Sequence, residues 1–148
     1  MKITIYSDGG ARGNPGPAGI GCVIQNAKCK SQNDNEKCKI IEISKYIGTA
    51  TNNQAEYQAV IEALKWLTAN SQLLTAKGEI EFFLDSQLVV EQLNQRYKLK
   101  NEGLKPLFWQ IRDLVMELGG KVTFKYIPRQ ENIAADKLVN MAIDKAIK

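Results

Sequence analysis

The spacing of apolar residues changes along the chain, and this change restricts the fold more than any other feature of the sequence. Alternating segments rich in β-branched residues predict strands at 2–7, 20–25 and 39–46. Helical spacing then alternates with short apolar runs, which predicts a helix beginning at Thr51, helices at 86–95, 104–118 and 132–148, and strands at 79–84 and 121–127. The order βββαβααβα predicts an α/β fold with a five-stranded mixed sheet, an antiparallel meander followed by parallel strands, flanked by helices.

Local signals mark where several of these elements begin and end. Residues 9–17 hold too much Gly and Pro for regular structure and are expected to form a turn. The polar segment 28–37 is expected to be a hairpin loop. Thr51 and Gln54 have the spacing of a capping box, and Gly119–Gly120 should end the helix at 104–118.

The chain of 148 residues has the length of one domain, and no linker, repeat or low-complexity stretch divides it. We therefore expect residues 1–148 to form a single domain. No apolar run approaches the roughly 18 residues that a membrane span needs. Met1–Thr4 leads straight into the first strand, so we expect no signal peptide and a cytoplasmic protein.

The chain has a formal net charge of +4 and no histidine. The mild positive charge is compatible with a polyanionic partner without proving one. The absence of histidine excludes catalysis by Ser-His-Asp or Cys-His groups. Cys22, Cys29 and Cys38 match no zinc-binding spacing and are expected to be free thiols, so any metal site must use oxygen ligands.

Four carboxylates stand where the pattern asks for an apolar residue or where a predicted strand ends. Glu56 lies on the apolar face of its helix, and Asp136 lies on the apolar face of the last helix together with Ile133. Asp8 and Asp85 end the first and fourth predicted strands. Carboxyl ends of strands are where open α/β sheets place their ligands, so these acids are candidates for a functional site.

Taken singly, each acid has an ordinary explanation as a turn former, a helix cap or a first-turn acid that suits the helix dipole. Two carboxylates about 4 Å apart, however, repel by roughly 4 kcal/mol at an effective dielectric of 20. Four together would be a large liability in a domain whose stability is on the order of 5–15 kcal/mol. If the four converge, divalent cations would relieve the repulsion, and an all-oxygen ligand set suits Mg²⁺ or Mn²⁺.

Four segments around these acids resemble the motifs of the type 1 ribonuclease H family, in the family's order. The first is YSDGGARGNPGPAG at 6–19, and the second is TNNQAE at 51–56. The third is DSQLV at 85–89, and the last is RQENIAADKL at 129–138. One such motif alone would be weak, but the ordered set covers nearly the whole chain. The sequence thus resembles a short type 1 ribonuclease H without the family's basic handle, which implies a ribonuclease H-like fold.

The resemblance implies an endoribonuclease that hydrolyses the RNA strand of RNA–DNA hybrids and leaves 5′-phosphate and 3′-hydroxyl ends. It implies that the catalytic metal ligands are Asp8, Glu56, Asp85 and Asp136, which would hold two Mg²⁺ ions, with Mn²⁺ as a substitute and Asp8 bridging both. In this scheme one ion activates the attacking water and the other stabilises the leaving 3′-oxygen. The expected partner is the hybrid and not a membrane, and a monomer is expected.

The same resemblance assigns substrate contacts to polar residues of the first three motifs. Asn14, Asn52, Asn53 and Gln87 match contacts to the minor groove, where side-chain amides can donate to and accept from the RNA 2′-hydroxyl. Thr51 matches a contact to a phosphate of the DNA strand. Helix capping would equally explain Thr51 and Asn52, and a turn would explain Asn14.

Around the connection between the helices at 86–95 and 104–118, a single acid, Glu102, is surrounded by Arg96, Lys98, Lys100 and Lys105. Lys98 and Lys100 are expected to contact nucleic acid. Tyr97 and Trp109 add stacking surface for a strand nearby. Charge runs are usually just solvated, and the connection here is short where longer relatives carry a basic handle.

The loop before the last helix departs from the family pattern. Many members carry a histidine there, whereas this chain reads IPRQEN at 127–132. An arginine guanidinium keeps its proton near neutral pH, so Arg129 cannot act as a base. We expect Arg129 to contact phosphate and the proton transfers to proceed without a side-chain base, with assistance from Glu131 as the alternative.

Three other functions compete with this interpretation. A catalytically inactive hybrid-binding module would have no need of four repelling acids. A DNA nuclease of the resolvase or transposase kind would leave the segment at 51–53 unexplained. A dinucleotide-binding loop at 9–19 is disfavoured because Pro15 and Pro17 prevent a glycine turn that opens a helix.

Overall fold

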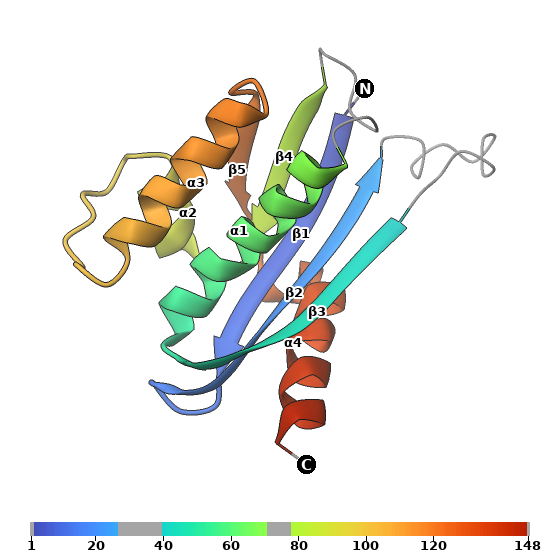
Figure 1. Cartoon of the computed structure of the whole chain (residues 1–148), viewed down its shortest axis with the longest axis vertical. Helices are drawn as coiled ribbons and strands as arrows, with labels where there is room; N and C mark the ends of the chain where they lie inside the picture. Colours follow the sequence, from blue (N-terminus) through green and yellow to red (C-terminus); the bar gives the residue numbers. More distant parts are fainter. Residues whose placement is uncertain (1, 27–39, 71–77, 148) are drawn as a thin grey trace.

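The computed structural model describes residues 2–26, 40–70 and 78–147, and a five-stranded sheet forms its centre (Figure 1). Neighbouring strands follow the order β3-β2-β1-β4-β5. β1–β2 and β2–β3 are antiparallel, whereas β1–β4 and β4–β5 are parallel, so the expected mixed sheet is confirmed. The bounds of the strands are β1 Lys2–Ala11, β2 Gly16–Asn26, β3 Ile40–Ala50, β4 Glu79–Leu84 and β5 Val122–Tyr126.

The α-helices of the described ranges are α1 Asn52–Ala69, α2 Gln87–Leu93, α3 Lys105–Glu117 and α4 Ile133–Ala146, and a 3₁₀ turn at Arg129–Glu131 precedes α4. The expected capping box opens α1. The Thr51 hydroxyl accepts a hydrogen bond from the Gln54 N–H (3.1 Å), and the Gln54 side chain accepts one from the Thr51 N–H (2.9 Å). Gly119 and Gly120, both at positive φ, end α3 as expected.

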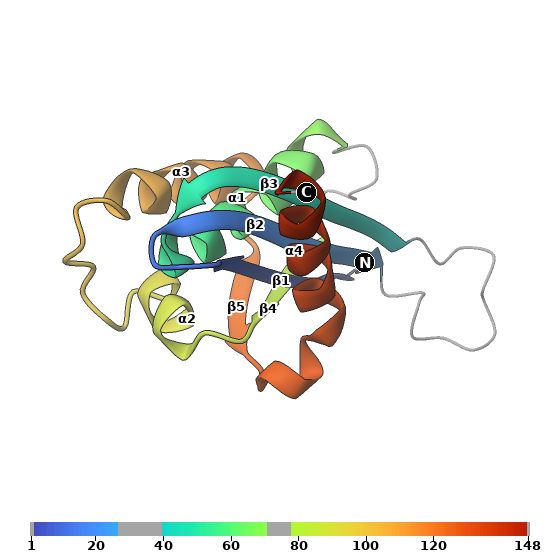
Figure 2. The same ribbon diagram turned by 90° about the horizontal axis from the view of Figure 1, so that it is seen from below.

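The helices cover both faces of the sheet. α1 packs on β1 and against α3, whereas α4 packs on β2, β3 and β1 from the opposite face (Figures 1 and 2). The main core lies between the sheet and α1, and its fully buried side chains include Ile5, Ile20, Tyr57, Leu64, Phe82 and Leu84. The parallel strands β1 and β4 run toward the same edge of the sheet, which is the edge where α/β sheets hold ligands.

Two expectations about individual residues are wrong. β1 continues through Gly9 to Ala11, and β2 already begins at Gly16, because residues 9–11 pair with residues 18–20. Asp8 therefore lies inside β1, and the turn is shorter than 9–17. Ile133 is 66% exposed, so it does not share the buried face of α4 with residues such as Val139.

The remaining expectations concern the hairpin loop, the cysteines and membrane-spanning segments. The predicted hairpin loop at 28–37 and the thiols of Cys29 and Cys38 lie outside the residues that the structure describes. Cys22 is a buried free thiol, as expected, and it donates to the Ala59 carbonyl oxygen (3.2 Å). Within the described ranges, no helix has both the length and the apolar character needed to cross a bilayer.

Candidate active site

Four different elements carry the four acids. Asp8 lies in β1, two residues beyond the last residue of this strand that pairs with β4. Asp85 follows the last residue of β4 directly. Glu56 lies at the start of the second turn of α1, and Asp136 lies in the first turn of α4. The acids therefore reach the same edge from two neighbouring strands and from a helix on each face of the sheet.

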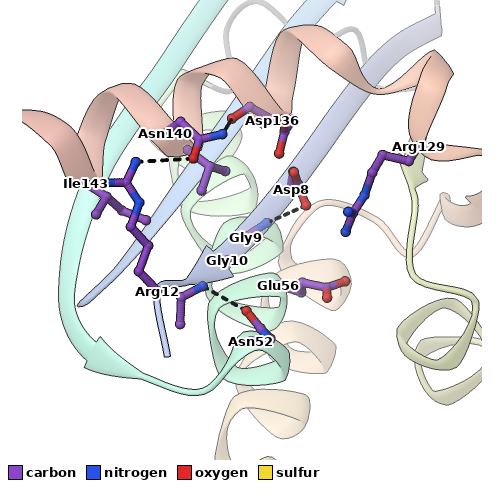
Figure 3. A pocket seen from close by; sticks show the side chains of 12 residues that line it. Asp8, Gly9, Gly10, Arg12, Asn52, Glu56, Arg129, Asp136, Asn140 and Ile143 are labelled. Atoms are coloured by element: carbon purple, nitrogen blue, oxygen red, sulfur yellow. Dashed lines mark hydrogen bonds between the residues drawn. The ribbon is translucent and has the colours of Figure 1, made fainter. Parts of the chain in front are cut away.

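Asp8 lies at the centre of this group. Burial, followed by the negative charges of Asp85, Glu56 and Asp136, raises the pKa of the Asp8 carboxyl to about 8, and a hydrogen bond with Asp136 adds to the rise. Figure 3 shows the carboxyl groups of Asp8 and Asp136 turned toward one another. All three other acids thus act on Asp8 through space, although they are far apart in the sequence.

Glu56 has a similar environment with one opposing cation. Burial and the charge of Asp85 raise the pKa of Glu56 to about 8, against a hydrogen bond with Ser86 and the positive charge of Arg129. Arg129 extends toward Asp8 and Glu56 from the 3₁₀ turn (Figure 3). Arg129, from the loop at 127–132 that lacks a histidine, therefore lies beside the acids.

The acids do not form a ready-made metal cage. Among the residues that the structure describes, no group of three or more His, Cys, Asp or Glu side chains is arranged so that it could hold a metal ion. The pKa values of Asp8 and Glu56 are raised mainly by burial and further by the charges of neighbouring acids, and bound cations would oppose both effects.

Asn132, which was not predicted as a site residue, forms hydrogen bonds with two of the acids, Asp85 and Asp136. Its side-chain amide donates to the Ser7 carbonyl oxygen and to Asp85 Oδ2, both at 3.0 Å. Its own backbone carbonyl accepts from the Asp136 N–H (3.1 Å). The side chain is 1% exposed, and its Oδ1 has no partner among the described residues. The pairing of β1 with β4 ends at Tyr6 and Phe83, so the Asn132 amide joins the two strands where their ladder stops.

The sequence offered no signal for this role. An asparagine directly before a helix is typical of an N-cap, but the Asn132 side chain makes no capping hydrogen bond here. Its side chain points into the sheet, and only the fold shows that the carbonyl of residue 7 and the carboxylate of residue 85 lie next to it.

A cleft of about 230 Å³ opens beside the acids. Asp8, Glu56 and Asp136 line it, whereas Asp85 does not. Arg12 and Asn140 line its other end (Figure 3), and neither was singled out in the sequence. Arg12 contacts Asn140 (3.4 Å) and forms an ion pair with Asp144, so its charge is partly neutralised within the chain.

The predicted substrate residues fall into two groups. Asn52 and Arg129 line the cleft. Asn14 adjoins it through Asn52: the Asn14 side-chain oxygen accepts from the Asn52 N–H (3.1 Å), and the Asn52 side-chain oxygen accepts from the Ala11 N–H (2.8 Å). Thr51 directly precedes Asn52 as the N-cap of α1. These bonds fasten the turn after β1 to the start of α1.

The second group lies outside the cleft. Asn53 is half-buried in the first turn of α1, and Gln87 is exposed as the first residue of α2. Lys98 and Lys100 are exposed in the connection between α2 and α3. The structure thus brings the acids, Asn52 and Arg129 together but leaves the two lysines apart from them.

Known families and proteins resemble this chain over nearly its whole length. The reverse transcriptase-like family matches residues 6–142. A "Bifunctional protein" of Mycobacterium tuberculosis is 37% identical over 99% of this chain, but the chain spans only 36% of that relative's length. The first curated relatives are thus nearly three times as long as this chain.

Other relatives match over nearly their full length. A "Ribonuclease H" of Rickettsia canadensis is 32% identical, with 99% of this chain and 92% of that protein covered. The solved structure of LC11-RNase H1, isolated from compost, in complex with an RNA/DNA hybrid superposes with a TM-score of 0.87 at 46% identity over 99% of each chain. The ordered motifs, the sheet topology and these matches lead to one assignment: the chain belongs to the ribonuclease H family.

Proposed function

We propose that the chain is a metal-dependent endoribonuclease that hydrolyses the RNA strand of RNA–DNA hybrids and leaves 5′-phosphate and 3′-hydroxyl ends. The observation that carries the proposal is the cluster of acids from four elements: Asp8, Glu56 and Asp136 line one cleft, and the charge of Asp85 acts on the Asp8 carboxyl. The hybrid bound to LC11-RNase H1, a relative of 46% identity, supports this substrate class.

The proposed ligands are Asp8, Glu56, Asp85 and Asp136, which would hold two Mg²⁺ ions or, as a substitute, Mn²⁺. These residues fit hard divalent cations because all their donor atoms are carboxylate oxygens and because their mutual repulsion has no other full compensation in the cluster. Bound cations supply Lewis-acid stabilisation of the charge that develops on the phosphate oxygens. Asp8, on which all three other acids act, would be the central ligand.

Arg129 is proposed to bind phosphate. Its guanidinium is charged at every relevant pH and offers N–H donors in a planar fork that suits phosphate oxygens. The loop that carries it holds no histidine, so no imidazole there can move protons. Substitution to alanine should weaken hybrid binding and cleavage, and unchanged values for both would exclude this role.

Recognition of RNA is proposed to use the amides at the start of α1 and α2. The oxygens of Asn14 and Asn52 are occupied by backbone N–H groups, which directs their NH₂ groups outward as donors. The RNA 2′-hydroxyl accepts as well as donates, so it suits such donors. Asn53 and Gln87 are proposed to contact the same groove.

A cleavage assay tests the proposal. Labelled RNA–DNA hybrid, double-stranded RNA and double-stranded DNA are incubated in parallel with the chain, with Mg²⁺ or EDTA. We expect Mg²⁺-dependent cuts within the RNA strand of the hybrid, and loss of cleavage but not of hybrid binding in Asp85→Asn. Binding without cleavage by the unsubstituted chain would indicate an inactive hybrid-binding module, and cleavage of DNA would indicate a DNA nuclease.

That residues 1–148 act as a single domain, as a monomer and in the cytoplasm stays a prediction from the sequence. Gel filtration of the chain with light scattering would check the oligomeric state.

A further inference from the structure

Two glycines flank Asp8 in the sheet, one on each face. Gly9 follows Asp8 in β1, and Gly21 is the residue of β2 that pairs with Asp8. Since successive strand residues point to opposite faces, Gly9 faces α1, whereas Gly21 faces α4, as Asp8 does. Each glycine therefore lies beneath one of the two helices that carry an acid.

Both helices approach these glycines more closely than any side chain would allow. A methyl group added at Gly9 would lie 2.2 Å from the carbonyl carbon and oxygen of Ala55 and 2.5 Å from the Glu56 nitrogen. A methyl group added at Gly21 would lie 2.3 Å from the Ala135 carbonyl oxygen. At Gly9 these atoms belong to the peptide group that precedes Glu56 in α1. At Gly21 the nearest atom belongs to the peptide group that precedes Asp136 in α4, and Leu138 Cβ (2.7 Å) and the Val139 nitrogen (2.9 Å) follow.

The close approach of α4 is concentrated at its acidic end. Gly10 and Gly19 also face this helix, but methyl groups there would lie 3.6 Å from Val139 Cγ1 and 3.0 Å from the Val139 carbonyl oxygen. The separation between α4 and the sheet is thus smallest at the turn that holds Asp136. General packing of the helix does not require its tightest point to fall there.

From this geometry we infer that Gly9 and Gly21 are positioning residues: they set the distance of Glu56 and Asp136 from Asp8 and thereby make the acid cluster selective for small divalent cations. The inference rests on the proposed function, because it concerns the cations that the acids would hold. Mg²⁺ requires near-ideal octahedral geometry with ligands at about 2.0–2.1 Å, whereas Ca²⁺ accepts flexible geometry at about 2.3–2.6 Å. A cluster widened on one side should therefore lose Mg²⁺ before it loses Ca²⁺.

Gly21→Ala tests the inference on the α4 side. The new methyl group must displace the first turn of α4 by roughly 1 Å to reach ordinary van der Waals separation. Titration calorimetry with Mg²⁺ alone and with Ca²⁺ alone should show Mg²⁺ affinity reduced by about 10- to 100-fold, as for other changes in the support of metal ligands. Ca²⁺ affinity should fall less, so that the ratio of Mg²⁺ to Ca²⁺ affinity decreases. Gly9→Ala should lower the same ratio through α1.

Leu138→Ala is the matched control. Leu138 lies in α4 beside Gly21 and is buried, so its truncation destabilises the same helix by leaving a cavity without forcing the helix outward. This variant should have a lower melting temperature and an unchanged Mg²⁺ to Ca²⁺ affinity ratio. A change of the ratio in Leu138→Ala as large as in Gly21→Ala would show that loss of stability alone is responsible, and would overturn the inference.

If Gly21→Ala does not fold, the ratio of Mg²⁺ to Ca²⁺ affinity is measured in Gly19→Ala instead. The methyl group of this variant would lie 3.0 Å from α4 and requires only a small displacement of the helix. A smaller decrease of the ratio in the same direction supports the inference, and an unchanged ratio overturns it. The two proposals fail differently. An unsubstituted chain that binds no Mg²⁺ would overturn both, whereas normal Mg²⁺ binding with the same affinity ratio in folded Gly21→Ala would overturn the positioning role alone.

Discussion

At the scale of single residues, the site is a group of acids whose charges are poorly compensated within the chain. The pKa of Asp8 and the pKa of Glu56 are both raised to about 8, in each case chiefly by burial and then by neighbouring acids. A carboxyl whose pKa is higher in the folded than in the unfolded chain keeps its proton over a pH range in which the unfolded chain has lost it. Folding is therefore opposed more strongly as the pH rises through that range.

The stability of the metal-free protein should accordingly fall as the pH rises from about 4 to about 8. Asp8→Asn should reduce this slope and raise the free energy of unfolding at pH 8 by on the order of 2 kcal/mol. Urea unfolding in EDTA at several pH values measures both. Equal slopes in the unsubstituted chain and in Asp8→Asn would contradict the raised pKa of Asp8.

Asn132 gives the second prediction at this scale. Asn132→Ala removes the donor shared by the Ser7 carbonyl and Asp85, and should cost about 1–3 kcal/mol of stability. Because Asp85 loses its orientation, kcat should fall by about 10- to 100-fold with little change in KM.

Asn94→Ala is the control for Asn132. The Asn94 amide also donates to a strand carbonyl, that of Phe124 (3.0 Å), but it touches none of the acids. It should lose stability and retain kcat per folded molecule. A similar loss of kcat in both variants would argue against a specific role of Asn132.

At the scale of elements, the start of α1 combines a structural and a binding role in one residue. The Thr51 hydroxyl accepts the hydrogen bond of the capping box, and its own O–H stays available as a donor to phosphate. Both Thr51→Ala and Gln54→Ala should lower stability by about 1 kcal/mol through loss of the cap. Only Thr51→Ala should also weaken hybrid binding. Thermal unfolding and a hybrid-binding assay separate the two effects. Equal affinities of the two variants for the hybrid would show that Thr51 only caps the helix.

The elements also show what could be predicted from the sequence. The capping box of Thr51 and the glycines after α3 fixed two helix boundaries because each signal acts within a few residues. The segment 9–11 was mistaken for a turn because its small residues suit a strand only when another strand and a helix approach closely, which is a tertiary property.

The site residues likewise divide into those that a local sequence pattern marks and those whose role depends on tertiary contacts. Glu56 was predicted as a site residue because an acid interrupts an apolar helical face, and the family motifs pointed to all four acids. Asn132, Gly9 and Gly21 act through contacts between residues far apart in the chain, so no local pattern marks their roles.

At the scale of the whole molecule, the charge distribution should govern hybrid affinity. The formal net charge is +4, and Lys98 and Lys100 are exposed on one connection. Replacing both by alanine should weaken binding of any hybrid sequence and reduce the slope of log affinity against log salt by about 2. Lys121, exposed beside the opposite end of β4, is the control, and Lys121→Ala should leave the slope unchanged. Equal slopes in the unsubstituted chain, the double variant and Lys121→Ala would show that the hybrid does not contact Lys98 and Lys100.

The central claim is that acids from four elements share two cations at the edge of the sheet. The direct measurement is an anomalous difference map from a crystal of the chain bound to an uncleavable hybrid in Mn²⁺. We expect two peaks about 4 Å apart, with Asp8 contacting both and Glu56, Asp85 and Asp136 completing the ligand set. Peaks that avoid these carboxylates, or a map with none among them, would contradict it.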